Sequence, residues 1–240
     1  MLAARSFVRY KNLGREWLGP EETTMVQLAR CGFVSHADIP ALRAQFDTEN
    51  CLCLRDLIHP ELRPLLAAKL GDAQFATKHY DTVGDEFRMA PNLASGALQL
   101  MLNDEAVFSW VRRVTGCAPI GCFNGRIYRM TPGQGHSFAW HDDCPAKGNR
   151  LITLSIDLSA TPYSGGTLEI RRTDSKEIVF RASRLNWGDA LLFPISRSLE
   201  HRVTPVEGAD PKIAFAGWFQ KEPVFSAALN DRVSLASMVC

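Results

Sequence analysis

The chain has 240 residues, of which 46% are hydrophobic and 22% are charged, and its formal net charge is +1. These are ordinary values for one soluble globular domain. A nearly neutral chain without long blocks of like charge is not expected to bind nucleic acid by bulk electrostatics. No apolar run is long enough to span a bilayer, so no membrane partner is expected either. The oligomeric state is left open.

Cysteine usage and the first residues bear on the cellular location. The seven cysteines are odd in number and lack CxxC spacing, which is not typical of a secreted disulfide framework. A cytoplasmic location is therefore expected. Residues 1–24 are predicted to form an N-terminal extension. Up to Arg15 the extension contains basic but no acidic residues, which suits either an organelle-targeting peptide or a loosely ordered basic segment.

Residues 25–118 are predicted to be a mainly helical support. In the segment HPELRPLLAAKLG, Pro60 lies near the first turn, the leucines share one stripe, and Gly71 ends the helix. In NDEAVFSWVRRVTG, Asn103 and two acidic residues precede apolar residues at helical spacing, and Gly116 follows two arginines. Both helices are expected to serve packing.

From about Cys122 the hydrophobic pattern changes to period two. The clearest example is NRLITLSIDLSA, and further strands are predicted in GTLEIRR, EIVFRA, ALLFP, HRVTPV and KIAFAGWFQ. Seven or eight short strands without intervening helices cannot wind as alternating βαβ units. We therefore predict an α+β protein with a two-sheet jelly roll over residues 119–222, buttressed by the N-terminal helices. Residues 223–240 would be a C-terminal tail, and no linker divides residues 1–240 into two domains.

The stretch HSFAWHDDC concentrates candidate metal ligands. An extended strand sends residues i and i+2 to the same face, so His141 and Asp143 converge while Asp142 points away. His201, in the later segment SLEHRVTPVEG, can supply a third ligand. Two histidines and one carboxylate on one face of an octahedral ion leave three positions open, as in non-haem Fe(II) oxygenases. An HxD pair alone is a weak signal, because such pairs are common on protein surfaces.

The order of seven segments is far more specific than any one of them. The segments are RIYRMTPGQG, WHDD, NRLITLSIDLS, SGGTLEI, NWGDALLFP, HRVTPVEG and PKIAFAGWF, and they lie within roughly residues 120–220. In this order the chain resembles the 2-oxoglutarate/Fe(II)-dependent dioxygenase superfamily, in particular its prolyl 4-hydroxylase-like branch. The resemblance implies a double-stranded β-helix core in which His141, Asp143 and His201 bind Fe(II).

The resemblance also implies 2-oxoglutarate as cosubstrate and dioxygen as oxidant. Most family members hold the far carboxylate of 2-oxoglutarate with an arginine, and the aligned residue here is Lys212, which keeps the charge but not the bidentate fork. The competing interpretation is a solvated lysine on an edge strand. Tyr128 corresponds to a tyrosine that hydrogen-bonds the same carboxylate, although a longer turn before His141 leaves Met130 as an alternative. Trp140 and Trp218 flank the site as candidate substrate-binding residues or as packing.

The function implied by this resemblance is hydroxylation of an unactivated C–H bond, coupled to conversion of 2-oxoglutarate to succinate and CO2. Asp143 favours hydroxylation over halogenation, since related halogenases carry a small residue at that position. Desaturation or cyclisation of a small metabolite at the same iron centre is an alternative. A cupin-like binding module without enzymatic activity is another. The sequence leaves open whether the substrate is a peptidyl side chain or a small molecule.

Overall fold

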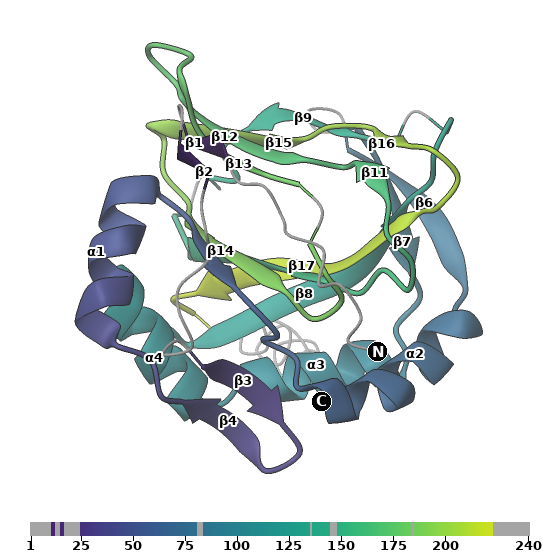
Figure 1. Ribbon diagram of the computed structural model, residues 1–240, viewed down its shortest axis with the longest axis horizontal. Helices are drawn as coiled ribbons and strands as arrows, with labels where there is room; N and C mark the ends of the chain where they lie inside the picture. The colour runs from purple at the N-terminus through teal and green to yellow at the C-terminus, as the bar shows by residue number, and fades with distance from the viewer. Residues whose placement is uncertain are drawn as a thin grey trace, which may run out of the picture.

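The computed structural model describes residues 11–12, 15–16, 25–80, 84–134, 136–144, 148–183 and 185–222. Two antiparallel sheets face each other, and helices cover the outer face of the larger sheet (Figure 1). The predicted α+β fold with a double-stranded β-helix core is thereby confirmed. The predicted tail, and the predicted N-terminal extension apart from two short strands, lie outside the described residues. No helix in the described part is long and apolar enough to cross a membrane.

The larger sheet has seven strands in the order β5-β14-β10-β17-β8-β7-β6. All neighbouring strands in it are antiparallel. In chain order the strands are β5 (Leu52–Leu54), β6 (Phe75–Tyr80), β7 (Gly84–Met89), β8 (Cys122–Met130), β10 (Arg150–Asp157), β14 (Ala190–Pro194) and β17 (Lys212–Gln220).

The smaller sheet has four strands in the order β13-β12-β15-β9. They are β9 (Phe138–His141), β12 (Leu168–Arg172), β13 (Ile178–Ala182) and β15 (Leu199–Val203). Three further two-stranded pairs complete the strand inventory of the described residues. These pairs are β1 (Lys11–Asn12) with β2 (Arg15–Glu16), β3 (Val26–Ala29) with β4 (Gly32–Ser35), and β11 (Ser164–Gly165) with β16 (Val206–Glu207).

Three of the four α-helices in the described part of the chain begin after a residue whose side chain accepts a hydrogen bond from the first turn of the helix. The helices are α1 (Ile39–Glu49), the 3-10 helix η1 (Pro60–Leu62), α2 (Arg63–Gly71), α3 (Leu93–Leu102) and α4 (Glu105–Thr115). At the start of α4 the side chain of Asp104 accepts a hydrogen bond from the backbone N–H of Ala106, and Gly116 ends this helix in the left-handed conformation. The helix predicted from Pro60 to Gly71 divides into η1 and α2.

Alternation along β17 separates two hydrophobic clusters. Phe215 and Phe219 pack in the cluster between the larger sheet and the helices. Ala214 and Ala216 point the other way, into the cluster between the two sheets. Because small side chains occupy this inner face, space remains between the sheets beside Lys212, as the period-two pattern predicted.

The support region is less purely helical than predicted. Residues 25–118 also contribute β5, β6 and β7, which lie at the two ends of the larger sheet. The β6-β7 hairpin joins the sheet through only two residue pairs, Phe87 with Arg129 and Arg88 with Tyr128. This hairpin brings residues from the first half of the chain beside the space between the sheets.

Candidate active site

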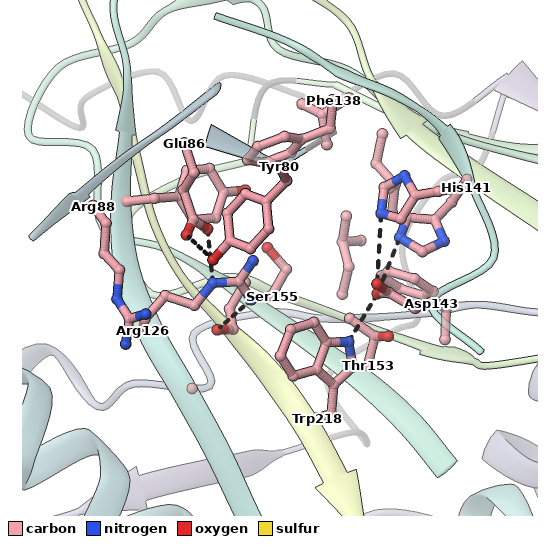
Figure 2. A pocket seen from close by; sticks show the side chains of 18 of the residues that line it. Tyr80, Glu86, Arg88, Arg126, Phe138, His141, Asp143, Thr153, Ser155 and Trp218 are labelled. Atoms are coloured by element: carbon pink, nitrogen blue, oxygen red, sulfur yellow. Dashed lines mark hydrogen bonds and ion pairs between the residues drawn. The ribbon is translucent and has the colours of Figure 1, made fainter. Parts of the chain in front are cut away.

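Two histidines and one aspartate converge between the two sheets (Figure 2). His141 ends β9 and lies directly opposite His201 of β15 in the antiparallel pairing. One potential ligand atom from each of His141, Asp143 and His201 lies within 4.8 Å of the others. The Nε2 atoms of His141 and His201 lie 3.7 and 3.5 Å from Oδ1 and Oδ2 of Asp143. The structure thus brings together the three residues predicted to bind the metal.

Asp143 reaches this cluster by a different route from the one predicted. Strand β9 ends at His141, so strand alternation does not place the Asp143 side chain. Asp143 instead adopts a φ of 57°, an uncommon left-handed conformation for a residue other than glycine. Asp142 lies outside the cluster, as predicted, and its Oδ1 accepts a hydrogen bond of 2.9 Å from the backbone N–H of Cys144.

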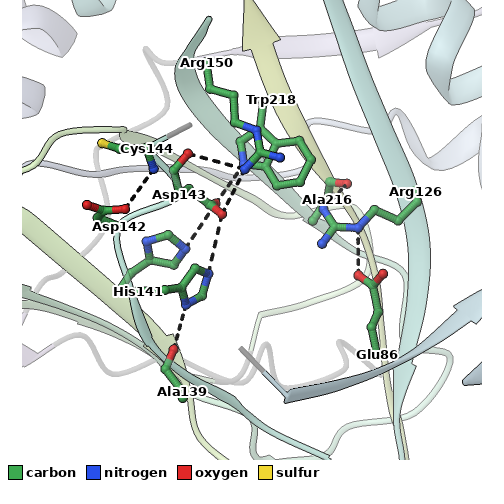
Figure 3. A network of polar contacts seen from close by, with 11 residues as sticks. Glu86, Arg126, Ala139, His141, Asp142, Asp143, Cys144, Arg150, Ala216 and Trp218 are labelled. Carbon is green, nitrogen blue, oxygen red and sulfur yellow. Dashed lines mark hydrogen bonds and ion pairs between the residues drawn. The ribbon is translucent and has the colours of Figure 1, made fainter. Parts of the chain in front are cut away.

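Two residues of the larger sheet hold the Asp143 carboxylate (Figure 3). The indole Nε1 of Trp218 donates a hydrogen bond of 2.8 Å to Oδ2. Nη1 of Arg150 lies 3.3 Å from both Oδ1 and the backbone carbonyl oxygen of Asp143. The Arg150 guanidinium also lies over the Trp218 ring, 3.5 Å from its centroid. Both side chains thereby fix the direction in which Asp143 offers its remaining lone pairs.

The protonation states suit metal binding. Burial, followed by the charge of His201, lowers the pKa of His141. Burial raises the pKa of the Asp143 carboxyl, but the hydrogen bond and charge of His201, with His141 and Trp218, outweigh it and lower the pKa overall. His141 donates through Nδ1 to the carbonyl oxygen of Ala139 at 2.6 Å, which leaves the Nε2 lone pair for a metal.

The chemistry of these donors fits Fe(II). Two imidazole nitrogens and one carboxylate oxygen form the donor set of the facial triad, which leaves three coordination positions for other ligands. The three side chains border a cavity of about 380 Å³ between the sheets. A metal held here would therefore be open to small molecules on the cavity side.

Lys212 lies in the same cavity and is buried, with 5% of its surface exposed. Its Nζ donates to the carbonyl oxygen of Gly166 at 2.6 Å. Burial lowers the pKa of Lys212 to about 8, and the charge of Asp157 acts in the opposite direction. The competing interpretation of a solvated edge-strand lysine is wrong, because β17 lies between β10 and β8. The ammonium group keeps donor capacity for an anion in the cavity.

Asp157 is a charged neighbour of Lys212 that the sequence did not single out. Its carboxylate accepts hydrogen bonds from the Tyr163 hydroxyl at 2.6 Å and from the backbone N–H of Ser159 at 2.9 Å. Burial raises the pKa of the Asp157 carboxyl, while Lys212 is the largest opposing influence. Since both oxygens of Asp157 already have donors, Lys212 is not its sole partner.

Four residues with hydroxyl groups border the cavity, namely Tyr80, Tyr128, Thr153 and Ser155. Tyr128 is buried, and burial is the largest cause that raises the pKa of its phenol. Tyr128 borders the cavity, whereas its alternative, Met130, is buried without bordering it. The Thr153 hydroxyl is buried and has no hydrogen-bond partner among the described residues. Thr153 pairs with Trp218, six residues along β17 from Lys212, so its orphaned hydroxyl can serve a ligand near the metal-binding residues.

The two predicted tryptophans have different positions. Trp218 borders the cavity, as predicted. Trp140 does not border the cavity: it packs against two guanidinium groups, with Arg171 and Arg202 lying 3.9 and 4.7 Å from its ring centroid. The physical reason is strand alternation: Trp140 directly precedes His141, which borders the cavity, so its side chain lies on the opposite face of β9. This position fits the packing alternative, and a role of Trp140 in substrate binding stays a prediction.

The β6-β7 hairpin supplies cavity residues that the sequence did not identify. They are Lys78, Tyr80, Glu86 and Arg88. Glu86 is fully buried and pairs with Arg126 of β8, its Oε1 lying 2.7 Å from the arginine Nε. The available signal was the Gly-containing turn within KHYDTVGDEFRM, which is compatible with a hairpin. Arg150 and Thr153 lie in the predicted strand NRLITLSIDLS, but the sequence predicted no role in the site for either residue.

This fold and this cluster of side chains are those of a non-haem Fe(II) oxygenase. Residues 125–220 match the family model described as the 2OG-Fe(II) oxygenase superfamily. This part of the chain is that of a 2OG-Fe(II) oxygenase, a superfamily of enzymes whose cofactors are Fe(II) and 2-oxoglutarate. None of the curated proteins shows significant similarity to the chain.

Solved structures share the fold. A Pseudomonas putida prolyl-4-hydroxylase is 15% identical with a TM-score of 0.57, covering 78% of this chain and 100% of that one. A Trichoplax adhaerens prolyl hydroxylase, in complex with a hypoxia inducible factor oxygen degradation domain peptide fragment, is 14% identical with a TM-score of 0.57, covering 76% and 89%. The non-heme alpha ketoglutarate dependent epimerase SnoN from nogalamycin biosynthesis is 10% identical with a TM-score of 0.57, covering 75% and 81%. At these identities the likeness shows the fold alone.

Proposed function

We propose that this protein hydroxylates an unactivated C–H bond in a peptidyl side chain or a small molecule, with 2-oxoglutarate as cosubstrate. The observation that carries the proposal is the convergence of His141, Asp143 and His201 in one cavity with the buried cation Lys212. When bound, Fe(II) and 2-oxoglutarate supply the oxidising chemistry, in which dioxygen is consumed and 2-oxoglutarate becomes succinate and CO2.

The chain's own residues would bind, orient and shield these reactants. His141, Asp143 and His201 would hold Fe(II), while Trp218 and Arg150 keep the Asp143 carboxylate in one orientation. Their N–H donors lie at 2.8 and 3.3 Å from it. A carboxylate fixed in this way loses little conformational freedom when it binds a metal.

Lys212 would hold the far carboxylate of 2-oxoglutarate at the closed side of the cavity. Lys212 is buried, and its ammonium group uses one N–H for the carbonyl oxygen of Gly166, which leaves N–H donors for a carboxylate. Tyr128 would add a hydrogen bond, since it borders the cavity and pairs with Ala214, two residues from Lys212. Thr153 would offer its hydroxyl nearer the metal, because it pairs with Trp218. Trp218 would form part of the wall beside the metal, where its ring excludes water.

The reaction outcome is part of this proposal. The presence of Asp143 in the cluster supports hydroxylation over halogenation. Desaturation and cyclisation are the competing outcomes, and SnoN shows that this fold also accommodates an epimerase. The Trichoplax adhaerens enzyme binds a peptide fragment. Both peptidyl and small-molecule substrates therefore stay within the proposal.

The proposal includes a domain organisation for the chain. Residues 119–222 would form the catalytic core and residues 25–118 its support, within a single domain. The packing of α3 and α4 against β8 and β17 supports this arrangement. The β6-β7 hairpin extends the role of the support region, because it borders the cavity.

Conversion of 2-oxoglutarate to succinate tests the proposal. We expect the Fe(II)-loaded protein to form succinate slowly even without its prime substrate, and His201→Ala to abolish this activity and the visible Fe(II)–2-oxoglutarate absorption band. Asp142→Ala is the matched control, because its side chain lies outside the cluster and caps Cys144. An absence of succinate from the wild-type protein would favour a non-enzymatic binding module.

A further inference from the structure

The cavity carries more positive charge than the proposed function uses. Five basic residues and two acidic residues border it, although the whole chain has 27 basic and 26 acidic residues. The basic residues are Lys78, Arg88, Arg126, Arg150 and Lys212, and the acidic ones are Glu86 and Asp143. This local excess does not follow from the overall composition.

Three of these cations have a defined partner or role. Arg150 is paired with Asp143, at 3.3 Å. Arg126 is paired with the buried carboxylate of Glu86, at 2.7 Å. Lys212 is the proposed contact for the far carboxylate of 2-oxoglutarate. Lys78 and Arg88 remain, both on the β6-β7 hairpin.

Neither remaining cation has an ion pair within the described part of the chain. Arg88 is half-buried, borders the cavity, and has no hydrogen bond with another described residue. Lys78 is exposed, with its Nζ 5.1 Å from the centroid of the Tyr80 ring. A half-buried guanidinium group without a partner among the described residues leaves its donors available to a ligand in the cavity that it borders.

Glu86 is the acidic residue of the hairpin that borders the cavity with these cations, and it is already engaged. It lies opposite Lys78 in the hairpin register and two residues from Arg88 in β7. Its Oε1 accepts from Arg126, and its Oε2 accepts from the Tyr80 hydroxyl at 3.3 Å. Among the described residues that border the cavity, the hairpin therefore has no further acidic side chain to pair with Lys78 or Arg88.

The position of Arg88 separates it from the metal cluster and from Lys212. Arg88 pairs with Tyr128 across β7 and β8, two strands away from β17 in the sheet. Figure 2 shows Arg88 and Arg126 on the side of the cavity opposite His141 and Asp143. A molecule that contacts Arg88 can thus extend across the cavity toward the metal cluster.

We propose that the prime substrate carries an oxyanion, a carboxylate or a phosphate, and that Arg88 with Lys78 binds it. The inference rests on the proposed function, because it concerns the substrate of the same site. Guanidinium groups bind both oxyanions through two parallel hydrogen bonds, and Lys78 adds a second positive charge. The anion would anchor one end of the substrate at the hairpin while the C–H bond to be oxidised faces the metal cluster.

Protection of Arg88 from chemical modification tests the anion site without knowledge of the substrate. The protein, loaded anaerobically with Fe(II) and 2-oxoglutarate, is treated with phenylglyoxal, and modification of each arginine is followed by peptide mass spectrometry. Arg113 is the internal control, because it is exposed on α4 and has no partner among the described residues. Benzoate and orthophosphate serve as the two probes.

We expect one probe, at about twice its dissociation constant, to slow Arg88 modification about threefold while Arg113 is unaffected. The effective probe distinguishes a carboxylate site from a phosphate site. Equal slowing at both arginines, or none at either, would overturn the inference.

Arginine variants connect this site to turnover. Compounds that stimulate succinate formation are compared with their neutral amide or dephosphorylated counterparts. We expect the anionic form to be preferred, and Arg88→Gln to weaken its apparent affinity at least about tenfold, the equivalent of about 1.4 kcal/mol. Arg88→Lys should retain part of the preference, and Arg113→Gln, which removes the same charge elsewhere, should retain all of it. Neutral counterparts that stimulate equally would contradict the inference.

Failure here is distinguishable from failure of the proposed function. If Arg88→Gln loses affinity for 2-oxoglutarate itself, Arg88 holds the cosubstrate, and the substrate inference falls while the oxygenase assignment stands. If the wild-type protein forms no succinate, the proposed function falls first.

Discussion

A lysine ammonium group at the closed side of a cavity is costly to bury unless anionic or polar groups surround it. Lys212 has one hydrogen bond, to the carbonyl oxygen of Gly166, and a carboxylate neighbour in Asp157. Asp157 is held by Tyr163 and Ser159, which limits how far it can move toward the ammonium group. The arrangement keeps Lys212 charged near neutral pH and leaves donors for a ligand.

Replacing Lys212 tests this role. We expect Lys212→Met to weaken 2-oxoglutarate binding at least about a hundredfold, because removing one partner of a buried charge pair typically costs roughly 3–5 kcal/mol. Iron binding should persist, since the metal cluster is unchanged. The measurement is an anaerobic titration of 2-oxoglutarate into the Fe(II) form, followed by the visible absorption band. An unchanged dissociation constant would assign the cosubstrate to Arg126 or Arg150 instead.

Repeating the 2-oxoglutarate titration at several pH values tests whether the charge of Lys212 is responsible for the binding. Burial lowers the pKa of Lys212 to about 8, so the free protein loses this positive charge as pH rises through that value. Affinity for the dianionic cosubstrate should therefore be highest below about pH 8 and fall at higher pH, by up to about tenfold per pH unit. Lys212→Met should lack this decline, and Lys212→Arg should bind with intermediate affinity and without it.

At the scale of elements, β17 and β8 approach each other closely behind the cavity. Gly217 and Gly125 are directly paired in this register. A methyl group added to Gly217 would overlap the Asn124 carbonyl oxygen and the Gly125 Cα. Because β17 also carries Lys212 and Trp218, this close contact helps to set the positions of both cavity residues.

Gly217→Ala should therefore destabilise the protein. We expect the free energy of unfolding to fall by about 1–3 kcal/mol, the usual cost of adding a carbon atom to a well-packed interior. Urea unfolding of the metal-free protein measures the change. Gly96→Ala, within α3, is the matched control because a Cβ there meets no atom within 4 Å. It should be neutral or stabilising. Equal effects of both substitutions would show that the two strands can separate to make room.

The strands that period-two sequence patterns predicted are those with alternate side chains buried in a hydrophobic cluster. In β10 and β17 the alternation of side chains predicts both the strand and the face that points inward. The β6-β7 hairpin could not be predicted in the same way. Most residues of β6 are exposed, so its sequence lacks the alternation that burial imposes. The cavity role of Arg88 and Glu86 consequently appears only in the structure.

Local irregularities also limited prediction of the site. The HxD spacing identified the right carboxylate, but Asp143 reaches the cluster through a left-handed turn that no residue pattern indicated. The bulge in β9 lets Phe138 and His141, which are three residues apart, both border the cavity, and regular alternation would not predict this. The hydrogen bond from Trp218 to Asp143 joins residues 75 positions apart and depends on how the sheets face each other.

At the scale of the whole molecule, the three candidate metal ligands connect the two sheets. His141 and His201 belong to the smaller sheet, while Asp143 is held by Trp218 and Arg150 of the larger one. Asp143 itself lies between β9 and β10, one strand from each sheet. A metal bound by all three residues would thus add a cross-link between the sheets that the unfolded chain cannot form.

Metal binding should consequently raise thermal stability. At a free metal concentration about 100 times the dissociation constant, a ligand specific to the folded state contributes about 2.7 kcal/mol. For a domain of this size each kcal/mol raises Tm by about 2–4 °C, so anaerobic Fe(II) should raise Tm by about 5–10 °C over the chelator-treated protein. His201→Ala should lose most of this response, because two remaining ligands bind a metal far more weakly, whereas Asp142→Ala should keep it. A full response in His201→Ala would place the metal elsewhere. The cluster between the sheets would then be a hydrogen-bonded network that stabilises the fold without a metal.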